Sequence, residues 1–276
     1  MMRLAAALLV YSSTSEARAC YQKDVDDSNW LWWRFNLHDC RSLNMNNVTL
    51  GVRGAAALAR ALAGNSALHS LSLERTQLGS AGAAVLADAL KHDVGIIDLD
   101  LEDNGIGAAG ANSIALAITG ARDAPCSLRS LDLEDNGLGD DGAIAIATAL
   151  SSRSAPLLVL DVERNAIGSR GAKALARAVA RNSVLKELDC HENPFEADGV
   201  AAFARALGRN AALTRLSLPD PEPSLALRPR RRHNAWLKLA LAFAAANEQA
   251  PSKTSLRRKK AALQRRARVR HRHRGG

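Results

Sequence analysis

The chain has 276 residues, enough for one or two domains, and its 47% hydrophobic content is ordinary for a folded protein. The net charge of +9 is unevenly divided, because residues 228–276 hold 16 Lys and Arg against one acid, whereas residues 1–227 hold 21 bases and 27 acids. No stretch of the sequence approaches the roughly 20 apolar residues that cross a bilayer, so we expect no transmembrane segment.

Residues 1–36 form an N-terminal segment that precedes the regular part of the chain. The apolar run at 4–11 and the Ala-Arg-Ala at 17–19 are similar to a short secretory signal with its cleavage site, and the alternative is a frayed amphipathic helix. Three of the four tryptophans follow at 30–33. They predict a cap over the first repeat or, alternatively, an exposed contact for a partner protein.

Residues 37–219 contain one motif that recurs about every 28 residues. In Leu128-x-x-Leu131-x-Leu133 the alternation predicts a short strand that buries leucines and turns Asp132 outward. A turn asparagine and an alanine-rich helix follow. Such a period is typical of repeat architectures. The strand leucines are Leu43, Leu71, Leu99, Leu131, Leu160, Leu188 and Leu216, at intervals of 28, 28, 32, 29, 28 and 28 residues.

Three further positions of the repeat carry structural expectations. The turn asparagines can bond the backbone of the neighbouring turn, but Val48, Thr76 and Pro221 replace them, so this row should fray at both ends. A glycine at each helix start leaves room where a side chain would hold the helix away from its strand. The longest interval predicts an extra loop at 119–126, on one rim. The turn asparagines are Asn104, Asn136, Asn165 and Asn193.

The pattern L-x-x-L-x-L-x-x-N-x-[LI]-G-x-x-G-A at 96–111, 128–143 and 157–172 resembles the leucine-rich repeat proteins of the ribonuclease-inhibitor-like class. The resemblance covers about residues 37–218. It implies an α/β solenoid, a horseshoe of six to seven repeats with parallel strands on the concave face and helices on the convex face. It also implies a surface that binds proteins, and no enzyme activity.

The C-terminal part divides into a linker and a tail. Residues 220–250 are rich in proline and arginine and then apolar, which predicts a linker and a capping helix that begins near Asn234. Residues 251–276 have little to bury and should be a disordered basic tail. The tail could bind nucleic acid or an anionic surface, direct nuclear entry, or fold back on the acidic repeats. It has no aromatic residues, which argues against base stacking.

Motifs for chemistry are either absent or belong to the repeat. G-x-G-x-x-G occurs at 105–110 and 137–142, but Gln77 and Ala166 stand at the first glycine in other repeats, so we reject nucleotide binding. No serine nucleophile elbow, Walker loop or H-E-x-x-H is present. The cysteines lack zinc spacing, and Cys190 replaces a strand leucine, which predicts a buried thiol. We therefore expect no enzyme activity, cofactor or metal.

Two cysteines near the N-terminus are candidates for a disulfide bond. Cys20 and Cys40 could form a disulfide in a secreted cap, although nothing in the sequence requires it. A cytoplasmic or nuclear location is the main expectation. The alternative is secretion, which would follow if the signal-like N-terminal segment is a true secretory signal.

Parallel stacking of the strands should align acidic residues in a row. Neighbouring strands lie ~4.8 Å apart, so adjacent carboxylates repel by roughly 0.8 kcal/mol even in a water-like dielectric. The row predicts a non-enzymatic scaffold that binds a basic protein, although repeat duplication alone could have copied it. The predicted partner-binding residues are Glu74, Asp98, Asp100, Glu102, Asp132, Glu134, Asp161, Glu163, Asp189 and His191.

Three alternatives to the scaffold function remain open. Ran GTPase-activating proteins are similar to this repeat class, but they carry an acidic region after the repeats, whereas this chain carries a basic one. Immune-type receptors also carry similar repeats, but the nucleotide-binding domain of those receptors is missing from this sequence. The third alternative is a nucleic-acid-associated protein that acts through the basic tail.

Overall fold

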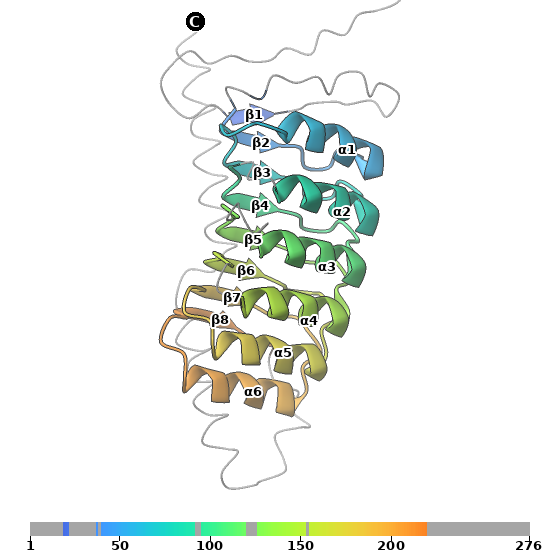
Figure 1. Ribbon diagram of the computed structural model, residues 1–276. Coiled ribbons are helices and arrows are strands. Elements are labelled where there is room, and N and C mark those ends of the chain that lie inside the picture. The colour runs from blue at the N-terminus through green and yellow to red at the C-terminus, as the bar shows by residue number, and fades with distance from the viewer. Residues whose placement is uncertain are drawn as a thin grey trace, which may run out of the picture.

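The computed structural model describes residues 19–21, 37, 40–91, 95–119, 126–152 and 155–219. Within these residues one parallel sheet follows the chain order, and one helix lies between most successive strands (Figure 1). The strands are β1 (Ala19–Tyr21), β2 (Ser42–Asn44), β3 (Ser70–Ser72), β4 (Asp98–Asp100), β5 (Ser130–Asp132), β6 (Val159–Asp161), β7 (Glu187–Asp189) and β8 (Arg215–Ser217). The helices are α1 (Gly51–Leu62), α2 (Gly79–Leu90), α3 (Gly107–Ile118), α4 (Gly139–Leu150), α5 (Ser169–Val179) and α6 (Ala197–Leu207).

The arrangement is the α/β solenoid that the repeat predicts. The strands stack along one side of the molecule and the helices along the other (Figure 1). Leu71, Leu99 and Leu131 are direct partners in the register, so the repeat period of the sequence is the register of the sheet. The strand leucines and the alanines of the helices form one continuous core between the two layers. The sheet stays open because its strands are paired in a line and not in a ring.

The predicted row of asparagines is confirmed, and we call it the asparagine ladder. The Asn136 Oδ1 accepts hydrogen bonds from the backbone N–H groups of Asn104 (3.1 Å) and Ile106 (3.2 Å), both one repeat earlier. Its Nδ2 donates to the Leu101 carbonyl at 2.8 Å. Each amide thus satisfies polar groups that stacking buries. The ladder consists of Asn104, Asn136, Asn165 and Asn193, all at most 4% exposed.

The expected fraying at the N-terminal side is wrong at Thr76. Its backbone N–H donates to Asn104 Oδ1 at 3.0 Å, and its hydroxyl donates to the same oxygen at 2.8 Å. Thr76 is fully buried, so the threonine continues the asparagine ladder with a shorter side chain.

The glycines at the helix starts make room for the neighbouring helix, whereas the sequence predicted that they make room for the strand. A Cβ on Gly110 would lie 3.1 Å from Ala83 Cβ of α2 and 3.2 Å from the Ser80 Cα. It would also clash with Cγ2 of Ile106, four residues earlier. The glycine therefore lets neighbouring helices approach, whereas the sequence suggested an approach between helix and strand.

Each central turn contains residues with left-handed backbone. The first such position lies three residues after the end of each of the strands β2 to β7, and non-glycine residues occupy it at a cost of roughly 1–2 kcal/mol each. The second is Gln77, Gly105, Gly137 or Ala166, with φ between 52° and 63°. The shared geometry confirms that the G-x-G-x-x-G matches belong to the repeat turn. The first position holds Asn47, Arg75, Asp103, Asp135, Arg164 and Glu192, with φ between 50° and 63°.

The N-terminal end of the sheet contains a strand that the sequence did not predict. β1 pairs in parallel with β2, with Cys20 opposite Leu43. Cys40 is disulfide-bonded, as the hypothesis of an N-terminal disulfide requires. The predicted signal at 4–11, tryptophan cap, linker, capping helix and basic tail lie outside the described residues, as does most of the predicted loop at 119–126.

Candidate binding face on the strand side

The predicted alignment of the aspartates is confirmed by the register of the sheet. Asp100 pairs with Asp132, Asp132 with Asp161, and Asp161 with Asp189. The glutamates two residues later continue the pairing, because the Asp103 N–H donates to the Glu134 carbonyl at 3.0 Å and the Arg75 N–H to the Glu102 carbonyl at 3.0 Å. We call eight carboxylates the acidic ladder: Glu74, Asp100, Glu102, Asp132, Glu134, Asp161, Glu163 and Asp189.

Each ladder aspartate has a structural task in its own turn. One oxygen of Asp132 accepts the Glu134 N–H at 3.1 Å, and one oxygen of Asp161 accepts the Glu163 N–H at 3.0 Å. Such bonds to the backbone two residues on are the usual reason for aspartate in a turn. Duplication of the repeat therefore accounts for the aspartates, and their alignment as charges follows from it.

The two ends of the aspartate row differ from its middle. Ser72 Oγ donates to Asp100 at 2.9 Å, and Ser217 Oγ donates to Asp189 at 3.0 Å. Between these ends, Asp132 and Asp161 have carboxylates as register partners on both sides. Negative charge is therefore most concentrated over β5 and β6.

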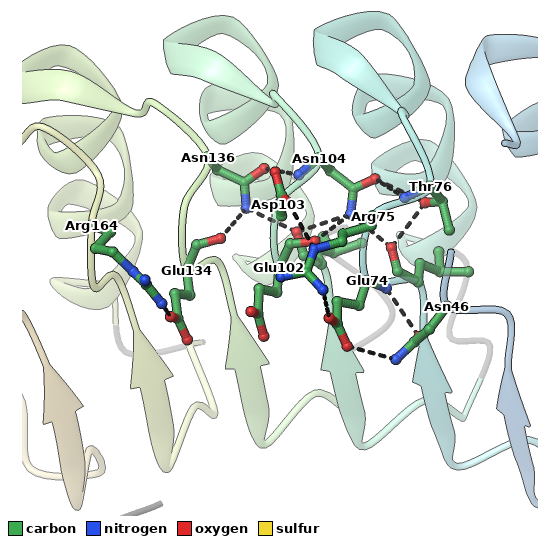
Figure 2. Close-up of polar contacts among 12 residues, drawn as sticks. Asn46, Glu74, Arg75, Thr76, Glu102, Asp103, Asn104, Glu134, Asn136 and Arg164 are labelled. Carbon is green, nitrogen blue, oxygen red and sulfur yellow. Dashed lines mark hydrogen bonds and ion pairs between the residues drawn. The ribbon is translucent and has the colours of Figure 1, made fainter. Parts of the chain in front are cut away.

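Two arginines from the first left-handed position supply counter-charge to the glutamates. Arg164 donates to Glu134, and Arg75 contacts Glu74 at 3.0 Å and Asp103 at 2.9 Å (Figure 2). In the same view Glu74, Glu102 and Glu134 extend side by side from successive repeats. Among the residues that the structure describes, two arginines thus pair with a row of eight carboxylates, so acids outnumber bases in this part of the face.

Three of the side chains at the predicted outward positions are nevertheless buried. Glu102 is 7% exposed, Glu134 is 6% exposed and Asp161 is 2% exposed. Glu134 packs under Arg164, and the Asp161 carboxylate lies within 4.8 Å of groups on both sides, because the close spacing of strands presses the row together. The other carboxylates of the acidic ladder are half-buried.

Glu163 is the carboxyl on which this crowding acts most clearly. Burial and, after it, the negative charges of Glu134, Asp189 and Asp161 together raise its pKa to about 7, whereas Arg164 lowers it. A positive ligand bound near such a carboxyl would stabilise its ionised form. The C-terminal half of the acidic ladder is therefore its most electronegative part.

The two remaining predicted residues lie beside the acidic ladder. Asp98 is exposed at the start of β4 and pairs with Ser70 and Ser130, so it has no acidic register partner. The His191 Nδ1 lies 3.9 Å from Glu163 and 3.8 Å from Glu192. Asp98 is thus isolated from the row, whereas His191 lies beside Glu163 in the turn after β7.

Carboxylate oxygens of successive repeats are close enough to share a cation. In the described residues three acidic triads, such as Asp132, Glu134 and Asp161, have ligand atoms within 4.8 Å of one another. Oxygen donors suit hard cations, but calcium takes six to eight of them and each triad offers three. This geometry matches the ammonium and guanidinium groups of a protein as well as it matches an ion.

Sequence reasoning missed the side chains that partner the acidic ladder. Arg75 and Arg164 each follow a ladder glutamate directly, and that adjacency was the available signal. Asn46 is a further missed contact, because its Nδ2 donates to Glu74 at 2.9 Å. These residues therefore position the Glu74 and Glu134 carboxylates within the acidic ladder.

The cysteine predictions have a clear outcome. Cys190 is a buried free thiol in the place of a strand leucine, as predicted, and burial raises its thiol pKa well above the usual value. Cys126 is buried as well. Neither cysteine contributes to the binding face.

Comparison with known proteins places the repeats in a family. The family described as "Leucine Rich repeat" matches residues 96–115, 124–147 and 153–176, which are three successive repeats of this solenoid. The chain contains leucine-rich repeats. Leucine-rich repeat proteins generally mediate contacts between proteins, and their fold is typically a non-enzymatic scaffold. Membership of the ribonuclease-inhibitor-like class stays a prediction.

Two solved structures are similar to this chain at low sequence identity. One, of the actin-binding site 2 of leiomodin-1, is 16% identical over 89% of this chain and 99% of that chain, with a TM-score of 0.28. Another, of a TLR13–ssRNA13 complex, is 15% identical over 67% of this chain and 31% of that chain, with a TM-score of 0.36. No curated protein gives a significant sequence match. The assignment therefore rests on the repeats themselves.

None of the helices in the described part of the chain has the length and apolar character that crossing a bilayer requires.

Proposed function

We propose that this leucine-rich repeat protein is a scaffold that binds a basic segment of another protein along the acidic ladder. The observation that carries the proposal is the unbroken register of Asp100, Asp132, Asp161 and Asp189, with glutamates beside them. The raised pKa of Glu163 supports it, because a cation placed nearby would relieve the repulsion that raises this pKa.

The dimensions of the acidic ladder suit a short extended peptide. Five strands, from β3 to β7, lie ~4.8 Å apart and so span about 19 Å. An extended segment rises about 3.3 Å per residue, so roughly six residues cover that distance. Its alternate side chains would lie on one side about 6.6 Å apart, which places three cations over the row.

The test is a calorimetric titration of a hexapeptide with alternating lysines into wild type and two variants. One variant replaces Asp100, Asp132, Asp161 and Asp189 by asparagine. Asparagine keeps the oxygen that bonds the turn backbone, whereas lysine at the buried Asp161 would also disturb the fold. The matched control neutralises four exposed acids on the helical side: Asp88, Asp141, Glu196 and Asp198.

We expect at least tenfold weaker binding in the ladder variant and nearly unchanged binding in the control. Wild-type affinity should rise between pH 6 and pH 8, because the bound cation favours ionised Glu163 and must displace its proton at the lower pH. Equal affinity of the ladder variant and wild type would place the site elsewhere. EDTA in all samples removes competition from divalent cations.

The fold-back hypothesis makes the chain's own tail a competitor for this face. Deletion of residues 252–276 should then raise the affinity of the acidic ladder for the hexapeptide. Unchanged affinity after the deletion would reject fold-back and leave the scaffold proposal intact.

The other functions that the resemblance implied stay predictions. A GTP-hydrolysis assay with small GTPases would test the GTPase-activating alternative. Nothing in the described geometry favours that alternative or the immune-type receptor fragment over the scaffold.

A further inference from the structure

The helical side of the last repeats carries a row of cations. Arg170, Lys173, Arg177 and Arg181 follow one another at intervals of three, four and four residues, so they share one face of α5 and its continuation. The stretch from Arg170 to Arg181 contains no acidic residue. One flank of α5 is therefore wholly basic.

The two halves of this row differ in their partners. Arg170 contacts Asp141 at 2.7 Å, and Lys173 contacts Asp198. By contrast, Arg177 and Arg181 are exposed and have no carboxylate within ion-pair distance among the residues that the structure describes. The positive charge that remains uncompensated thus lies toward the C-terminal end of α5.

The neighbouring helix repeats the same two positions. Arg205 and Arg209 stand 28 residues after Arg177 and Arg181, on α6 and directly beyond it, and both are exposed. They too lack an ion-pair partner within the described ranges. α5 and α6 lie side by side at one end of the solenoid (Figure 1). We call these four residues the arginine patch.

Repeat duplication does not account for the arginine patch. At the register of Arg177 the earlier helices carry Arg60, Asp88, Leu116 and Thr148, and at the register of Arg181 the fourth helix is followed by Ser152. The pairing of two arginines per helix therefore belongs to α5 and α6 among the described repeats. It is a local feature of the surface.

We propose that the arginine patch binds the phosphodiester backbone of a nucleic acid. Arginines four residues apart rise about 6 Å along a helix, and packed helices lie about 8–10 Å apart, so the four guanidinium groups cover an area that several phosphates of one strand can enter. Guanidinium groups bind phosphate oxygens in bidentate fashion. The recognition is independent of base sequence, because phosphate contacts fix position and carry no sequence information.

The surroundings of the patch favour a nucleic acid over a membrane. The exposed large hydrophobic residues of the described chain are Val52, Leu116 and Leu158, and none lies on α5 or α6. A surface that inserts into a bilayer needs apolar side chains beside its cations. The aromatic rings of α6 and its preceding turn, Phe195 and Phe203, are buried and stack on each other at 5.9 Å, so they offer no platform for bases.

The test measures fluorescence anisotropy of two labelled probes, a 20-nucleotide oligouridylate and a 20-base-pair DNA duplex, with the full chain at 50–300 mM KCl. The patch variant replaces Arg177, Arg181, Arg205 and Arg209 by glutamine. The matched control replaces four other exposed arginines by glutamine: Arg41, Arg53, Arg60 and Arg129. A third variant has lysine at the four patch positions. Each variant keeps the C-terminal tail, so the binding of the tail is common to all.

The expected result is a change in salt dependence that only the patch variant shows. The slope of log affinity against log salt falls by about 0.9 for each duplex phosphate that the protein no longer neutralises, and by about 0.7 for each phosphate of a single strand. Neutralising four phosphates fewer lowers the duplex slope by about 3 to 4, and affinity at 100 mM KCl falls at least tenfold. The lysine variant keeps the wild-type slope, which separates the removal of charge from a disturbed fold.

Four outcomes would overturn the proposal. The patch variant could match wild type, the control could weaken binding as much as the patch variant, or the lysine variant could weaken it as much as the glutamine variant. The fourth is patch-dependent binding to phosphatidylserine vesicles or to polyglutamate at least as tight as to the oligonucleotides, which would assign the patch to a membrane or an acidic protein. Asparagine substitution of the acidic ladder should leave nucleic-acid binding undiminished, so this proposal and the scaffold proposal can fail separately.

Discussion

Two rows of side chains cross the same repeats four residues apart and behave in opposite ways. Asp132 belongs to the acidic ladder, and Asn136, in the same turn, belongs to the asparagine ladder. Each asparagine donates and accepts hydrogen bonds across the repeat boundary, so repetition adds stabilising contacts. Each aspartate bonds its own turn and meets like charges across the boundary, so repetition adds repulsion. In this solenoid the asparagine position of each turn therefore contributes stability, and the aspartate position four residues earlier contributes the charge that a ligand could bind.

The largest effect should come from breaking the asparagine ladder. Replacement of Asn136 by alanine removes the side-chain acceptor of two buried backbone N–H groups, those of Asn104 and Ile106, while the Leu101 carbonyl keeps its bond from Asn104 Nδ2. Each buried N–H group left unsatisfied costs about 1–3 kcal/mol, so we expect a loss of about 2–6 kcal/mol in the free energy of unfolding. Urea denaturation followed by circular dichroism measures it.

The control for this variant is alanine at Asn112, an exposed residue of α3. It makes the same chemical change without touching the ladder and should leave the unfolding midpoint nearly unchanged. If both variants lost equal stability, the asparagine ladder would not hold the repeats together.

A smaller loss should follow from removing the counter-charge of the acidic ladder. Replacement of Arg164 by glutamine deprives the buried Glu134 of the guanidinium that bonds it, which should cost about 1–2 kcal/mol. It should also raise the pKa of Glu163 above its value of about 7, because Arg164 lowers it. NMR titration of the Glu163 carboxyl measures the second effect. Glutamine at the more exposed Arg75 is the control and should leave the Glu163 titration in place.

The smallest effect is a gain in stability when charge is removed from the acidic ladder. The pKa of Glu163 is higher in the folded protein than in the unfolded chain, so its favourable contribution is complete below about pH 4.5 and is lost as the pH rises through about 7. Replacement by glutamine should therefore stabilise the protein by roughly 1 kcal/mol at pH 8, less than the full shift implies, because water reaches this partly exposed group.

The same glutamine variant should show little difference from wild type at pH 4. Thermal unfolding at both pH values checks the sign. A gain that is equal at the two values would mean that Glu163 does not titrate between them, and glutamine at the exposed Glu196 serves as the control.

The sequence was sufficient for the repeat, the register and the asparagine ladder, because one periodicity determines all three. Leucines at fixed intervals become direct partners in the sheet, and Asn136 bonds the repeat before it. The expectation for Thr76 was wrong because its hydroxyl donates to Asn104 Oδ1, so a threonine can stand at the end of the asparagine ladder. The register also aligned Asp100 with Asp132 as predicted.

Burial and pairing within the acidic ladder were beyond sequence reasoning. Asp161 and Glu134 have outward positions in the alternation, but the close spacing of strands and the reach of Arg164 bury them. The arginine patch was missed for a related reason. Its members are spread over 33 residues of sequence. Residues 1–227 have a negative net charge because acids outnumber bases there, so the net charge gave no sign of a local group of arginines.

The left-handed position three residues after each of the strands β3 to β7 has a consequence for how such a protein changes over generations. Since Arg75, Asp103, Asp135, Arg164 and Glu192 all adopt the same backbone there, a side chain of either sign fits without a new turn. Copying a repeat extends the row of carboxylates by one step. A single substitution at the left-handed position then decides whether the new step adds to the negative charge or cancels part of it. Length and charge of the binding face can thus be inherited separately, and a descendant can acquire a different ligand while keeping every contact that holds its repeats together.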